Sequence, residues 1–142
     1  MRPLMLSGAA ALLLVAVGCA PTLPEVAKPV PVKGTVVLPG GRPLSGGVVT
    51  FLPAGDRLAG RYQGWGFVKP DGSFEVAAFA DATKGGGVAP GTYKVVIGPR
   101  DEGEPRGSNA HLIPRKYQDA ATTPLTVEVD AGGSVLPPFA LN

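Results

Sequence analysis

The sequence of 142 residues has one cysteine and one histidine, and its formal net charge is only +2. An intrachain disulfide needs two cysteines and is therefore excluded. A single histidine leaves few ways to build a histidine-based metal site or a Ser-His-Asp triad. The small net charge provides no basic stripe, so we expect no nucleic-acid partner. The sequence predicts no metal site and no cofactor.

Glycine and proline, in contrast, are abundant, with 21 and 16 residues. A share this high approaches that of low-complexity chains. Leucine, isoleucine, valine and phenylalanine nevertheless exceed the roughly 20% below which disorder is expected. The length suits one domain. We therefore predict a single folded domain in which much of the glycine and proline supplies turns.

The first 19 residues have the layout of an export signal. Arg2 precedes an apolar run over residues 9–17, which ends at Gly18 and Cys19. The run is shorter than the ~20 apolar residues that a membrane-spanning helix needs. The pattern predicts a signal peptide over residues 1–18. The same layout also fits an ordinary secretory signal with an incidental cysteine, or a signal anchor that is never cleaved.

The segment Ala16-Val17-Gly18-Cys19 resembles the lipobox of bacterial lipoproteins, with alanine at a position where that motif usually has leucine. The resemblance implies that the Cys19 sulfur carries a diacylglyceryl lipid with acyl chains such as palmitate. It also implies cleavage before Cys19, which makes this residue the mature N-terminus. Two or three acyl chains hold a protein firmly in a membrane. Ala20 stands where aspartate signals inner-membrane retention in enteric bacteria. The expected location is the cell envelope, at the outer membrane or cell surface rather than the inner membrane.

Residues 19–31 combine this lipid anchor with a proline-rich segment containing Pro21, Pro24, Pro29 and Pro31. Such a composition favours extended, polyproline-like backbone and indicates a semi-rigid tether.

From residue 32 to residue 142 the sequence favours short strands separated by turn residues, without a helical period. The strands are expected at 32–38, 47–53, 63–68, 73–79, 92–98, 125–130 and 139–141. Residues 54–62, 81–88 and 99–113 lack this pattern and are expected to be loops. We predict an all-β, antiparallel, seven-stranded β-sandwich. Its expected core contains Val36, Phe51, Phe67, Phe74, Tyr93, Val95, Val127 and Phe139.

The order of several motifs is similar to that in carboxypeptidase regulatory-like domains. They are V-K-G-T-V from residue 32, G-R-P-L-S-G-G-V from residue 41, P-D-G-S-F from residue 70 and A-P-G-T-Y-K-V from residue 89. The region after residue 113 resembles the C-terminal half of small bacterial lipoproteins with this domain. The resemblance implies a transthyretin-like (prealbumin-like) sandwich without shared catalytic residues, and thus no enzyme.

Two reactive relatives of this fold fit the residues poorly. Hydroxyisourate hydrolases use several histidines and a C-terminal Tyr-Arg-Gly-Ser, whereas this chain has only His111 and ends at Asn142. Pilin-like domains join a first-strand lysine to a last-strand asparagine with the help of a glutamate. Lys33 and Asn142 occupy such places, but Gly86 stands where the glutamate is expected. We therefore expect neither reaction.

Two aromatic residues, Tyr62 and Trp65, are candidate ligand-binding residues. Trp65 lies between two glycines, which cannot shield it, so its ring is suited to stacking on a sugar. The favoured interpretation, however, is that Trp65 faces inward and belongs to the core. Arg115, Lys116 and Tyr117 form a basic-aromatic cluster, which fits either a surface strand end or contact with anionic envelope material.

These features favour a non-enzymatic, lipid-anchored envelope protein that presents a β-sandwich for binding or structural interaction. The alternatives are a surface carbohydrate-binding module and an accessory subunit of an envelope complex. The expected partners are the membrane, through the lipid on Cys19, and an envelope glycan or protein.

Overall fold

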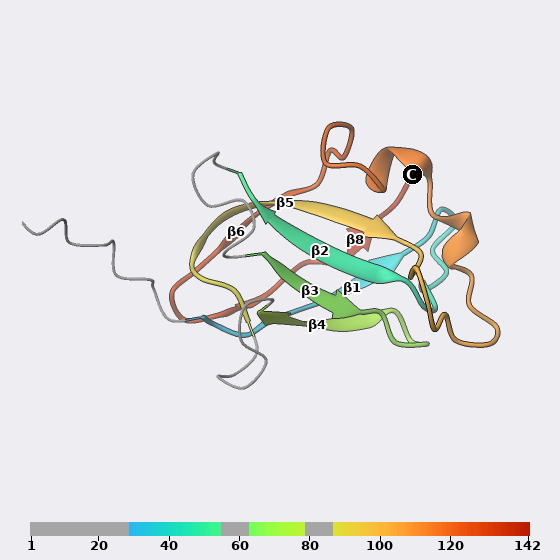
Figure 1. Cartoon of the computed structure of the whole chain (residues 1–142), viewed down its shortest axis with the longest axis horizontal. Coiled ribbons are helices and arrows are strands. Elements are labelled where there is room, and N and C mark those ends of the chain that lie inside the picture. The colour runs from blue at the N-terminus through green and yellow to red at the C-terminus, as the bar shows by residue number, and fades with distance from the viewer. Residues whose placement is uncertain (1–28, 55–62, 79–86) are drawn as a thin grey trace, which may run out of the picture.

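The structure is a computed structural model that describes residues 29–54, 63–78 and 87–142 (Figure 1). It contains eight strands and two short 3-10 helices in these ranges. The strands are β1 (Val32–Val37), β2 (Val48–Pro53), β3 (Gly64–Phe67), β4 (Ser73–Ala78), β5 (Gly91–Gly98), β6 (Thr126–Val129), β7 (Ser134–Val135) and β8 (Phe139–Ala140). The 3-10 helices are η1 (Ala110–Leu112) and η2 (Arg115–Tyr117).

The strands form two sheets, which agrees with the prediction of an all-β sandwich (Figure 1). One sheet has the order β6-β5-β2-β3 with antiparallel pairs, and the other has β4, β1, β7 and β8. Strand β4 joins them, because Ser73–Val76 pair with β1 whereas Ala77 and Ala78 pair with β3. The hydrophobic residues between the sheets form one core.

The prediction of a purely antiparallel, seven-stranded arrangement is wrong in two respects. Both β7 and β8 run parallel to β1, with Val36 opposite Phe139. Alternating hydrophobicity specifies which face of a strand is buried and leaves the direction of its neighbour open. The eighth strand, β7, has two residues and is too short to leave such a pattern. The chain reaches it through a turn in which Gly133 N–H donates to Asp130 O.

The predicted turn between β3 and β4 is present. Gly72 N–H donates to Lys69 O over 2.9 Å, and Gly72 has the positive φ of +85° that favours glycine. The Asp71 carboxylate accepts hydrogen bonds from the side chain and the backbone N–H of Ser73, at 2.6 and 2.9 Å. These two bonds, the side-chain bond first, hold the pKa of Asp71 below its ordinary value.

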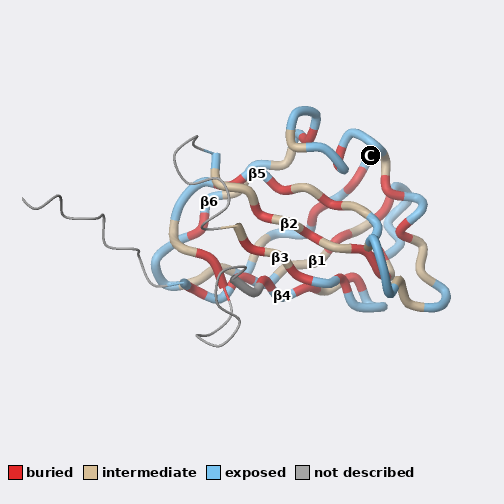
Figure 2. Tube along the Cα trace, viewed as in Figure 1, coloured by how far each residue is buried: buried red, intermediate tan, exposed pale blue. Residues whose placement is uncertain are grey.

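Buried and exposed positions alternate along the strands (Figure 2). Of the eight predicted core residues, six are buried: Val36, Phe51, Phe74, Tyr93, Val95 and Phe139. Val127 is partly buried and packs against them. The rings of Phe74 and Phe139 stack at 5.9 Å, and those of Phe51 and Tyr93 meet edge to face at 6.0 Å. The Phe51 and Phe74 rings, with centroids 6.2 Å apart, make the contact that joins the two sheets.

The prediction that Phe67 belongs to the core is wrong, because 46% of the residue is exposed. Gly64 and Gly66 take the buried positions of β3, so Trp65 and Phe67 point to the opposite face. Glycine is required at residue 66 because a Cβ there would collide with the Glu75 carbonyl oxygen. The backbone of β4 thus lies against Gly66 on the inner face of β3, the face that was expected to carry the Phe67 side chain.

Tyr93 stabilises the entry to β5. Its hydroxyl donates to Ala89 O over 2.6 Å, four residues upstream. This geometry is that of the tyrosine corner found in Greek-key sandwiches. The ring is buried, and burial raises the pKa of Tyr93.

Candidate functional site

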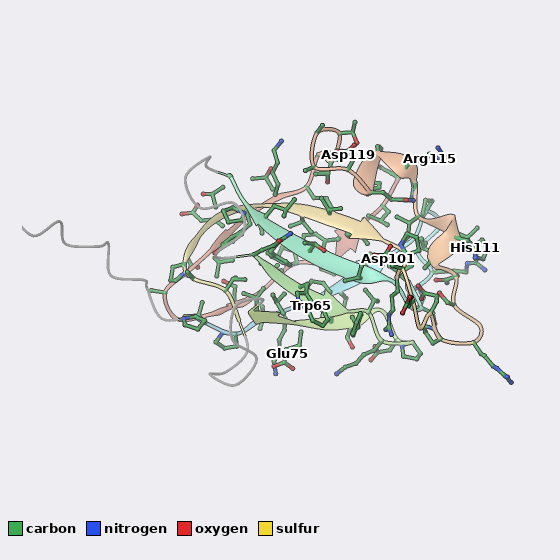
Figure 3. All side chains as sticks on the ribbon, viewed as in Figure 1. Trp65, Glu75, Asp101, His111, Arg115 and Asp119 are labelled. Atoms are coloured by element: carbon green, nitrogen blue, oxygen red, sulfur yellow. The ribbon has the colours of Figure 1, made fainter. Side chains whose placement is uncertain are left out.

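Trp65 lies on the outer face of the β6-β5-β2-β3 sheet, where it is partly exposed (Figure 3). It is absent from the hydrophobic core, so the favoured prediction of an inward-facing Trp65 is wrong. Its neighbour across the sheet is Thr50. Trp65 faces outward because the flanking glycines fill the inward positions of β3.

Two further residues continue the surface that Trp65 begins. The Trp65 and Phe67 rings meet edge to face, with their centroids 4.7 Å apart. The Arg100 guanidinium lies over the Phe67 ring, 4.0 Å from its centroid. We call these three side chains the aromatic row. A cation over an aromatic face is attracted by the electrons of the ring.

Other partly buried side chains surround the aromatic row on the same face. Register places Val48 beside Phe67 and Thr50 beside Trp65 on β2, and pairs Thr50 with Val96 on β5. Small aliphatic and hydroxyl side chains therefore form a shallow floor beside two aromatic rings. A surface of this kind suits a flat ligand with one apolar face.

Arg100 is held over Phe67 by carbonyl groups of its own loop and of the segments beside β2 and β3. Its side-chain nitrogens lie 3.4 to 3.5 Å from the carbonyl oxygens of Gly47, Gly103 and Val68. Its backbone N–H donates to the Glu104 carboxylate over 2.8 Å. The guanidinium thus has fixed neighbours and keeps its charge at the end of the aromatic row.

Glu104 organises the loop that follows β5. Its Oε1 accepts from Gly47 N–H at 2.7 Å and lies 2.8 Å from Ser108 Oγ. Burial by itself raises the pKa of Glu104, but hydrogen bonds from Arg100, Ser108 and Gly47 outweigh it, so the pKa lies below its ordinary value. Asn109 adds two bonds to the same region: its Oδ1 accepts from Ser45 N–H and its Nδ2 donates to Pro43 O. The loop expected at residues 99–113 is therefore ordered by long-range contacts and includes η1.

The basic-aromatic cluster divides between surface and core. Arg115 and Lys116 are exposed, whereas Tyr117 is 1% exposed. The Tyr117 hydroxyl donates to Asn142 Oδ1 over 2.8 Å and accepts from Asn142 N–H over 3.1 Å. Tyr117 is therefore a buried residue that fixes η2 to the end of the chain, and it offers no surface for stacking.

The other candidate residues are placed as follows. Cys19 and Tyr62 lie outside the described residues. Lys33 and Asn142 are not brought together: Lys33 Nζ lies 3.8 Å from Glu75 Oε2, and Asn142 contacts Tyr117 and Lys116. His111 is exposed at η1.

Within residues 29–54, 63–78 and 87–142, no three His, Cys, Asp or Glu side chains are grouped as metal ligands would be. The same ranges contain no helix that has the length and hydropathy to cross a membrane.

Phe67, Arg100 and Glu104 were not predicted from the sequence to be parts of a surface site. The alternation Gly64-Trp65-Gly66-Phe67 carried a usable signal, because residues two apart in a strand share a face. No local pattern indicated Arg100, which reaches Phe67 from a separate loop.

Comparisons of the chain with protein-family models, curated proteins and solved structures find no match.

Proposed function

We propose that this chain is a non-enzymatic, lipid-anchored protein of the cell envelope, with a transthyretin-like sandwich that presents a binding surface. The observation that carries the proposal is the aromatic row on an outer sheet face. Two aromatic side chains and a cation at the surface contribute nothing to the core between the sheets. Exposed aromatic and arginine side chains are typical of binding surfaces.

The arrangement of the described chain supports one orientation relative to the proposed anchor. The segment that leads into β1 lies at one end of the sandwich, and η1 and η2 lie at the opposite end (Figure 1). A lipid on Cys19 would be ten residues before Pro29, which is about 35 Å of fully extended chain. The end with η1 and η2 would then face away from the membrane.

Contacts with the sandwich begin within the segment expected to be a tether. Val30 is buried, and its N–H donates to Val88 O over 2.8 Å. Pro31 O accepts from Ser134 N–H. This arrangement fixes the direction in which the chain leaves the domain.

The anchor is tested by labelling cells with radioactive palmitate. Wild type is expected to incorporate label and the Cys19→Ser variant to incorporate none, because the chain has no second cysteine. A Ser7→Ala variant, changed within the signal segment, serves as the control and should keep the label. Labelled Cys19→Ser protein would refute lipid attachment at this residue.

A second candidate function, carbohydrate binding, is favoured by the outward position of Trp65. The Trp65 and Phe67 rings and the Arg100 guanidinium offer an apolar face and hydrogen-bond donors, the combination that a sugar ring can use. A glycan array probed with full-length protein is the test. Trp65→Ala should lose the signals of wild type, whereas Val135→Ala, at an 85% exposed site on the other sheet, should keep them. Equal signals from wild type and Trp65→Ala would contradict this function.

A further inference from the structure

A second surface feature lies at the end of the sandwich with η1 and η2. It is an open, shallow cavity of about 700 Å³. Its floor contains Ala110 and Ile113, which are buried. His111, Arg115, Lys116 and Asp119 are among its lining residues. Figure 3 labels His111, Arg115 and Asp119, which lie near η1 and η2.

The walls of this cavity are held in place by hydrogen bonds. Ile113 O accepts from Gln118 Nε2 at 2.9 Å, and Lys116 O accepts from Thr122 Oγ1 at 2.8 Å. Tyr117, between the two basic residues and the core, is fixed through Asn142. The site is therefore largely formed before a ligand arrives, which lowers the ordering cost of binding.

The charges on the rim favour an anion. Arg115 and Lys116 are both cationic, and Asp119 is the one carboxylate among the lining residues. Asp119 Oδ1 already accepts from Ala121 N–H at 2.8 Å. Within the described residues, the Arg115 guanidinium has neither a hydrogen-bond acceptor nor an ion-pair partner. A planar guanidinium in this state is suited to bidentate contact with a carboxylate or phosphate.

The polar groups beside the cations favour a hydroxylated ligand. The Gln118 amide donates to Ile113 O, so its Oε1 can accept a hydrogen bond, and Asp119 has a second carboxylate oxygen. Acceptors next to cations match a molecule that carries both hydroxyl groups and an anionic group. A simple anion would leave these acceptors unused.

We propose that this cavity binds an acidic saccharide, with Arg115 and Lys116 holding its carboxylate or phosphate. The site is separate from the aromatic row, although the two are adjacent in sequence: Pro99 lines the cavity and Arg100 covers Phe67. In the anchored orientation proposed above, the cavity opens away from the chain's own membrane. A glycan of the surrounding envelope is thus a more accessible source of the anion than the headgroups of that membrane.

The test is titration of full-length, isotope-labelled protein in detergent micelles with glucuronate, glucose 6-phosphate and glucose, followed by NMR. Glucuronate should shift the amide signals of Arg115 and Lys116 saturably, with a Kd about tenfold below that of glucose. Tighter binding of glucose 6-phosphate would assign the anion as phosphate and support the same site. Equal affinity for glucose, or no shifts with either anion, would overturn the proposal.

Variants show whether Arg115 carries the affinity. Arg115→Ala should raise the Kd for glucuronate about tenfold. Arg115→Lys keeps the charge but lacks the planar pair of N–H donors, so its Kd should lie between those of Arg115→Ala and wild type. Arg106→Ala is the matched control, because Arg106 is an exposed arginine outside the cavity lining. Equal thermal melting of all four proteins would show that folding is unchanged. The same Kd for Arg115→Ala and Arg106→Ala would refute the assignment.

Discussion

Two carboxylates, Asp71 and Glu104, both accept backbone N–H groups, but they do so over very different distances along the chain. Asp71 bonds Ser73, two residues away, and is fully exposed. Glu104 bonds Gly47, which is 57 residues away, and is partly buried. The first carboxylate shapes a turn that its own neighbours already favour. The second fixes the position of a loop that places Arg100 over Phe67.

The most severe way to break the long-range arrangement is Gly46→Ala. Gly46 has φ +87°, and a Cβ there would collide with Glu104 Oε1 and Ser108 Oγ. Backbone strain and displaced hydrogen bonds together should lower the free energy of unfolding by about 2–4 kcal/mol, measured by urea denaturation.

Gly40→Ala is the control for that substitution. Gly40 has a similar φ of +90° but nothing within 4 Å of an added Cβ. The Gly40→Ala variant should therefore lose only about 1 kcal/mol of the free energy of unfolding, which is the cost of the backbone conformation. Equal losses at residues 40 and 46 would show that contact with Glu104 and Ser108 has no energetic consequence.

Removing the charge of Glu104 tests the network directly. Glu104→Gln keeps the size of the side chain but replaces one acceptor oxygen with a donor that faces Arg100 N–H. We expect a loss of about 1–3 kcal/mol in the free energy of unfolding by urea titration. Glu102→Gln, at an exposed position nearby, should change it by less than about 0.5 kcal/mol. A similar effect at residue 102 would contradict a specific role for Glu104.

The same carboxylate makes stability depend on pH. The pKa of Glu104 is lowered by folding, so its contribution is complete above its unfolded value, near 4.5, and is lost as the pH falls through the folded value. The stability difference between wild type and Glu104→Gln should therefore be largest above about pH 5 and shrink toward pH 3. Urea denaturation at each pH measures it. A difference that stays constant down to pH 3 would rule out this linkage.

The smallest effect is expected from Asp71→Ala. The residue is exposed, and Pro70 and Gly72 continue to favour the turn without it. Its midpoint of thermal unfolding should fall by less than that of Glu104→Gln, with Asp130→Ala, at the exposed end of β6, as a comparison in another turn. A larger fall than for Glu104→Gln would reverse the relative importance of the two carboxylates.

The same contrast explains what the sequence could predict. The Pro70-Asp71-Gly72 turn and the seven predicted strands depend on short patterns, and each appears in the structure close to its predicted place. The alternation Gly64-Trp65-Gly66-Phe67 indicated that the two rings share a face, but which face points outward depended on β4 lying against Gly66. Glu104 and Arg100 were missed for the same reason, since their partners come from distant segments.

The pairing of β1 with β7 and β8 has a consequence for when folding can finish. Val36 lies beside Phe139, so the first strand to be synthesised acquires its last neighbour only when nearly the whole chain is present. Contacts between segments so distant in sequence slow folding, because a long loop must close first. A chain with this topology cannot complete the sheet around its first strand until its synthesis is nearly over.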